Sequence, residues 1–270
     1  MIRASALCKT RFTTMFHERR INIKTPAELK IMREAGRINA TVLAKVRELL
    51  QPGVTTADLN AAAEEVLKSH GCVSPFKGYG HPPFPTSITV SINDEMVHGI
   101  PHPKRKLKDG DIVSIDCGTV YQGYVADSAF SAGVGQVSKE AQTLLEVTEE
   151  ALHAGISQMR KGRRTGDVSA AIQKYVESHG LHVTREYTGH GVGKDMHEGP
   201  QVPNYGAAGS GLVLKPGMTI ALEPMVLVGT YETRVLPDKW TVVSADGSLT
   251  AHFEHTVAVT EGEPQILTVL

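Results

Sequence analysis

Apolar positions early in the chain repeat at the spacing of an amphipathic helix. The segment Thr25-Pro26-Ala27-Glu28 predicts where this helix begins, because Thr and Glu three residues apart form a capping box and Pro suits the first helical position. Apolar side chains then recur from Met32 to Leu49, until Pro52-Gly53 ends the pattern. A second helix is expected from a cap at Thr56 to Gly71.

The same helix pair is expected again further along, from Ser138 to about Met159 and from a cap at Thr165 to Gly180. Between and after the pairs the apolar period becomes two, which is typical of strands. Gly118 to Gly123 predicts a hairpin turn between two of these strands. Each half is thus two helices followed by strands, and we predict an α+β fold around one mostly antiparallel sheet.

An internal repeat supports this division. The segment from Leu107 to Asp116 recurs from Leu214 to Glu223, and each copy ends on a carboxylate. Gly53 to Gly71 likewise matches Gly162 to Gly180 in register. Self-similarity of this length indicates two related halves, about 21–135 and 136–262, and we expect residues 21–270 to form a single domain.

Composition excludes some classes of protein. With 41% hydrophobic and 21% charged residues and a net charge of −1, the chain is an ordinary globular protein without a general attraction to DNA or membranes. No apolar run approaches the roughly 20 residues that span a bilayer. Its three cysteines form no metal-binding spacing, which favours a reducing, cytoplasmic compartment.

Residues 1–20 differ from the rest because five Lys or Arg accompany one acid, Glu18. Two interpretations stay open: a disordered or misassigned leader, since Met15 offers a second start, or an organellar import sequence.

Four carboxylates occupy matching places in the strands of the two halves: Asp116, Asp127, Glu223 and Glu254. One acid in a strand usually points to water. Four acids on inward faces cannot share a core without cations, because burying unpaired charge is prohibitive. Oxygen ligands of this kind suit divalent Mn, Co, Fe or Zn, and carboxylates can bridge two such ions.

Three histidines accompany these acids. His190 lies in a glycine-rich segment that lets the backbone approach a ligand, although a single histidine there is more often a turn residue. His98 and His197 each precede a proline by three residues and each precede a carboxylate strand. We expect His102, His255 and the remaining histidines to be solvent-exposed or packing residues.

Together these segments resemble type I methionine aminopeptidases over about residues 22–262. The resemblance rests on Asp116 and Asp127, on the His190 glycine loop, on Met-His197-Glu-Gly-Pro, on Ile-Ala-Leu-Glu223-Pro-Met and on Phe-Glu254-His-Thr. It implies the pita-bread fold, whose two pseudo-symmetric halves enclose two divalent metal ions. It also implies that Asp116 binds one ion, that His190 and Glu223 bind the other, and that Asp127 and Glu254 bridge both.

The implied reaction removes the N-terminal methionine of nascent polypeptides whose second residue is small. In this resemblance Glu223 moves the proton of the attacking water, and His98 with His197 hold the carbonyl and the oxyanion. The methionine pocket maps to Tyr79, Phe84, Met196 and Trp240. This sequence departs from the family pattern at Met196, at Thr89 and in a longer Tyr79–Phe84 segment.

We further expect a monomer that acts in the cytoplasm. The basic run Lys104–Lys106 with Lys108 is a solvated turn or, since the implied substrate is a nascent chain, a ribosome contact. Cys117 is expected to pack on the sheet face opposite Asp116.

Three other kinds of protein compete with this interpretation. Pita-bread peptidases of the proline-dipeptidase kind carry a large N-terminal domain, whereas here about 20 residues precede the first helix. Type II methionine enzymes carry a long insertion that the segment from His197 to Glu223 is too short to hold. A metal-free peptide-binding module predicts lost ligands, and all five are present.

Overall fold

Strands from both halves of the chain form one antiparallel sheet. The structure, a computed structural model, describes residues 20–270; the leader predicted for residues 1–20 therefore lies outside this range except for Arg20. The strand order is β1-β3-β4-β13-β8-β6-β7, with β14 paired to β13. The predicted α+β class is confirmed.

The first half contains α1 (Pro26–Glu48), α2 (Thr56–Ser69), β1 (Thr89–Ile92), β2 (Glu95–Val97), β3 (Ile112–Tyr121) and β4 (Tyr124–Gly133). The second half contains α3 (Lys139–Ile156), α4 (Thr165–Ser178), β5 (His182–Val183), β6 (Thr188–Gly191), β7 (Glu198–Pro203), β8 (Thr219–Leu222), β9 (Met225–Leu227), β10 (Thr233–Val235), β11 (Val242–Ser244), β12 (Thr250–His252), β13 (Glu254–Ala258) and β14 (Gln265–Ile266).

The four helices begin near the predicted residues, with two corrections. Thr25 caps α1 in a capping box with Glu28, and Ser138 caps α3, as expected. The predicted caps Thr56 and Thr165 are each the first helical residue instead. Their hydroxyl groups are engaged elsewhere: Thr56 Oγ1 donates to His102 O at 3.1 Å, and Thr165 Oγ1 accepts from Leu212 N at 3.1 Å. Tertiary contacts thus shift both caps one residue upstream, to Thr55 and Arg164.

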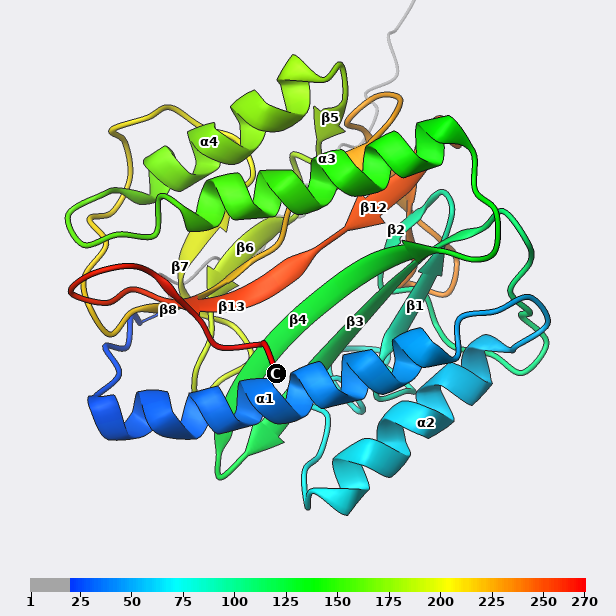
Figure 1. Ribbon diagram of the computed structural model, residues 1–270, viewed down its shortest axis with the longest axis horizontal. Helices are drawn as coiled ribbons and strands as arrows, with labels where there is room; N and C mark the ends of the chain where they lie inside the picture. The colour runs from blue at the N-terminus through cyan, green and yellow to red at the C-terminus, as the bar shows by residue number, and fades with distance from the viewer. Residues whose placement is uncertain (1–19) are drawn as a thin grey trace, which may run out of the picture.

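The helices of each half lie against that half's strands. Figure 1 shows α1 along β3 and β4 with α2 beside α1, and α3 and α4 beside the strands of the second half. Neighbouring strands β4 and β13 join the halves. Thr256 reinforces this junction, because its Oγ1 accepts from Asp127 N at 2.9 Å and donates to Asp127 O at 2.8 Å.

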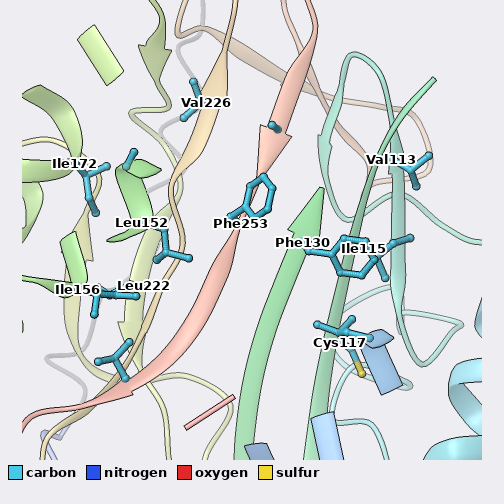
Figure 2. Close-up of a cluster of buried hydrophobic side chains, with 14 of the residues drawn as sticks. Val113, Ile115, Cys117, Phe130, Leu152, Ile156, Ile172, Leu222, Val226 and Phe253 are labelled. Atoms are coloured by element: carbon cyan, nitrogen blue, oxygen red, sulfur yellow. The ribbon is translucent and has the colours of Figure 1, made fainter. Parts of the chain in front are cut away.

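A continuous hydrophobic core fills the space between helices and sheet. Ile115 and Phe130 face each other across β3 and β4, while Leu152 of α3 and Ile172 of α4 belong to the same cluster (Figure 2). Cys117 is buried in this core as predicted. Because strand side chains alternate, Asp116 between Ile115 and Cys117 is directed to the opposite face. The helices therefore cover one face and leave the other for the carboxylates.

Two smaller sheets accompany the main one. Strands β10 and β11 pair with β2 of the first half to form one, and β12, β9 and β5 form the other. The segment Thr233–Ser244 that builds the first carries Trp240 between its strands. Of the helices in residues 20–270, none combines the length and the apolar character needed to cross a membrane.

Candidate metal centre

Strand register brings the four predicted carboxylates together. Asp116 on β3 and Glu254 on β13 both pair with Ala129 of the intervening strand β4. Asp127 lies two residues before Ala129 and so shares its face of β4. Glu223 directly follows β8, the next strand beyond β13. The small Ala129 side chain leaves room between acids from three adjacent strands.

His190 reaches the same place from β6, where it pairs with Ala221 of β8. Its Nε2 lies 3.5 Å from Glu223 Oε1 and 3.9 Å from Asp127 Oδ2. Ligand atoms of Asp127, His190 and Glu254 all lie within 4.8 Å of one another. A close approach of the backbone makes this possible, because a Cβ on Gly191 would meet Gly199 O at 2.1 Å.

The carboxylates are buried and face one another. Asp116, Asp127 and Glu254 expose 8%, 2% and 2% of their surface. Burial raises the pKa of Asp127 to about 7. Burial, and secondly the neighbouring carboxylates, raise the pKa values of Asp116, Glu223 and Glu254 well above the usual range. Protein groups alone therefore do not compensate this much negative charge.

The donor set fits divalent metal ions. Buried oxygens Asp116 Oδ1, Asp127 Oδ1 and Glu254 Oε1 have no hydrogen-bond partner. His190 Nδ1 lies 2.9 Å from Gly191 O, which can only accept, so Nδ1 carries a proton, and in the neutral ring Nε2 is the nitrogen that can bind a metal ion. A lone pair and several anionic oxygens around one point call for a cation, and this mixture of oxygen and imidazole ligands suits Mn, Fe, Co or Zn.

A cavity of about 130 Å³ opens beside these ligands. Its lining includes all the predicted site residues except Glu254, together with Phe76 and Thr89. Phe84 and Trp240 meet edge to face with ring centroids 5.2 Å apart. The pocket wall is thus aromatic and apolar on one side and ionisable on the other.

Two hydrogen bonds tie the Tyr79–Phe84 segment over this cavity. The Tyr79 hydroxyl lies 2.9 Å from His197 Nδ1, and Trp240 Nε1 donates to Pro82 O at 2.9 Å. The lengthened segment therefore contacts both a predicted catalytic histidine and a predicted pocket residue. Met196 lines the same cavity beside His197.

His98 also lines the pocket. Its backbone takes a φ of 61°, and its ring lies 6.1 Å from those of Tyr187 and Trp240, edge to face with each. Burial lowers the pKa of His98 to about 4, so this imidazole is neutral at neutral pH. A neutral imidazole can donate from one nitrogen and accept at the other.

His252, one of the histidines expected to be a solvent or packing residue, does pack, but against the carboxylates. This side chain is buried beside the carboxylates, with Nε2 3.7 Å from Glu223 Oε2. Its position two residues before Glu254, on the same strand face by alternation, was the available signal. His255 does pack as expected, with Nδ1 2.8 Å from Thr268 Oγ1.

Comparison with known proteins identifies the family. The model of metallopeptidase family M24 matches residues 30–261. The chain is 51% identical over 245 residues to methionine aminopeptidase 1 of Bacillus subtilis, covering 91% of this chain and 98% of that protein. It is 48% identical over 249 residues to a methionine aminopeptidase of Clostridium acetobutylicum, covering 92% and 99%. The crystal structure of methionine aminopeptidase from Thermotoga maritima superposes with a TM-score of 0.91 at 45% identity, covering 93% of this chain and all of that one.

Proposed function

The chain belongs to metallopeptidase family M24, and we propose that it hydrolyses the N-terminal methionine from new polypeptides whose second residue is small. The observation that carries the proposal is the set of buried carboxylates and His190 beside a pocket with an aromatic wall. The named function of its relatives, at 51% and 48% identity, supports the same substrate.

We infer that the centre holds two divalent ions, drawn from Mn, Co, Fe and Zn. Asp127 and Glu254, which come from neighbouring strands at the junction of the halves, would serve both ions, as the resemblance to methionine aminopeptidases implies. Asp116 would complete one site. His190 and Glu223, whose Nε2 and Oε1 lie 3.5 Å apart, would complete the other.

Bound ions of this kind activate water and polarise a carbonyl group. Glu223 takes the proton from the attacking water and returns it to the leaving amine. His197 donates to the substrate carbonyl and to the oxyanion that develops there, with Tyr79 fixing its ring through Nδ1. His98, neutral because of its burial, hydrogen-bonds the scissile peptide group without adding charge.

The methionine side chain occupies the apolar wall. Tyr79, Phe84, Met196 and Trp240 offer the packing and sulfur–aromatic contacts that a thioether can make. The cavity is small, so the second residue of the substrate peptide extends away from it toward the opening. We propose that residues 21–270 act as one monomeric domain in the cytoplasm, where they meet nascent chains at the ribosome.

The test compares two peptides. Stripped protein is given Mn or Co and offered Met-Ala-Ser or Met-Leu-Ser, and released methionine is measured. Metal-dependent release from the first peptide but not the second is expected. Folded protein that cleaves neither with any divalent ion would favour the metal-free binding module instead.

One variant pair makes this test specific to the centre. Asp127→Ala removes a ligand from both ions and is expected to abolish release. Glu150→Ala removes an exposed acid from α3 and is expected to retain it. Activity retained in Asp127→Ala would contradict the two-ion arrangement.

A further inference from the structure

His252 is a buried imidazole to which the chemistry above gives no role. It ends β12, exposes 2% of its surface, and its Nε2 has no hydrogen-bond partner. That nitrogen lies 3.7 Å from Glu223 Oε2 and 3.9 Å from Glu254 Oε2. An orphaned polar atom between two buried carboxylates needs an explanation, because buried polar groups are otherwise hydrogen-bonded.

The backbone of His252 is fixed by β4. His252 N donates to Ser131 Oγ at 2.9 Å, and Ser131 Oγ donates to His252 O at 2.8 Å. Ser131 is itself buried and pairs with Ser114 Oγ at 2.7 Å. The main chain that carries this ring is therefore tied directly to the strand that carries Asp127.

The two oxygens of Glu223 face different partners. Oε1 lies 3.5 Å from His190 Nε2, and in the proposed centre both atoms bind the same ion. Oε2 faces His252 Nε2 instead. A carboxylate that binds a metal through one oxygen is oriented when a donor holds the other oxygen. His252 Nε2–H is the donor within reach.

We propose that His252 is a positioning residue whose Nε2–H donates to Glu223 Oε2 and holds Oε1 toward the ion shared with His190. This inference rests on the proposed metal centre. It predicts that the separation of 3.7 Å contracts to ordinary hydrogen-bond length, below about 3.2 Å, when the ions are bound.

Two substitutions at this position test the role. His252→Ala removes the donor, and His252→Gln keeps an N–H at similar reach. Loss of a partner that orients a metal ligand typically costs about 10–100-fold in metal affinity or activity. We expect His252→Ala to bind one of two Mn ions that much more weakly in calorimetric titration of stripped protein, and His252→Gln to restore the affinity.

A matched control separates this effect from damage to the strand. His255→Gln replaces the neighbouring imidazole, which contacts Thr268 and not Glu223, and is expected to bind Mn as wild type does. Thermal unfolding in chelator shows that each variant is folded. With Met-Ala-Ser, the loss in His252→Ala should fall on kcat and leave KM unchanged, because the substrate pocket is intact.

The outcomes are distinct. Wild-type Mn affinity in His252→Ala overturns the proposal, and so does His252→Gln being as defective as His252→Ala. A Mn-bound crystal structure with His252 Nε2 still beyond hydrogen-bond distance of Glu223 Oε2 overturns it as well. Metal affinity is measured without peptide, so it tests the role of His252 independently of peptidase activity. A wild-type protein that binds Mn but releases no methionine refutes the proposed function, and the Mn titration of the variants still decides the role of His252.

Discussion

Replacing Asp127 with Asn should stabilise the metal-free protein while weakening its response to metal. Burial raises the pKa of Asp127 from 3.8 to about 7. Because one pKa unit corresponds to about 1.4 kcal/mol, keeping this carboxylate ionised in the folded state costs on the order of 4 kcal/mol. The charge on Asp127 also raises the pKa values of Asp116, Glu223 and Glu254, so its removal relieves them too.

The sign of the pH dependence follows from the raised pKa. The folded protein holds the Asp127 proton more tightly than the unfolded chain does. The protonated Asp127 carboxyl therefore stabilises the wild-type fold fully below about pH 4, and this stabilisation is lost as pH rises to about 7. Asn does not titrate. The free energy of unfolding of Asp127→Asn should therefore exceed that of wild type most strongly above about pH 7 and least near pH 4.

Urea unfolding in excess chelator, at about pH 5 and about pH 8, measures this difference. Glu150→Gln, which changes an exposed acid on α3, is the control and should match wild type at both values. Added Mn at a hundredfold excess over its Kd should stabilise wild type by about 2.7 kcal/mol for each ion bound, and the variant by much less. A variant no more stable than wild type at the higher pH, or a gap that does not widen with pH, would refute the reasoning.

Two smaller changes test the packing and the pocket. Gly36→Ala places a Cβ 2.1 Å from Leu267 O, so the variant should lose about 1–3 kcal/mol of unfolding free energy in urea despite the better helix propensity of Ala. Gly262→Ala is the control, because its Cβ meets nothing within 4 Å. Equal losses in both variants would contradict the steric argument. Tyr79→Phe removes the hydroxyl that contacts His197 Nδ1. The net hydrogen bond of about 0.5–1.5 kcal/mol predicts a loss of roughly 2–13-fold in kcat/KM, measured by steady-state kinetics on Met-Ala-Ser. An unchanged kcat/KM would show that the contact does not orient His197.

Local sequence patterns predicted most of the elements, because their causes are local. The capping box at Thr25 and Glu28 and the alternation around Asp116 need no distant partner to be recognised. The duplicated strand that ends at Glu223 also placed the acids of the two halves in equivalent positions. The carboxylate cluster was therefore predictable before any side chain was placed.

What was missed depends on contacts between distant residues. Thr56 was expected to cap α2, but His102 engages its hydroxyl, so Thr55 takes the cap. The contact of Tyr79 with His197 spans 118 residues and has no local signature. The place of His252 beside the carboxylates depends on Glu223, which a different strand supplies, as well as on Glu254 two residues further on.

The most direct test of the central claim is anomalous diffraction from crystals of the Mn-loaded protein. We expect two Mn peaks, roughly 3.5–4 Å apart, each bonded to an oxygen of Asp127 and of Glu254. One of the two should also be bonded to His190 Nε2, the nitrogen that faces Asp127 and Glu223. Fewer than two peaks at saturating Mn, or peaks away from these carboxylates, would contradict it.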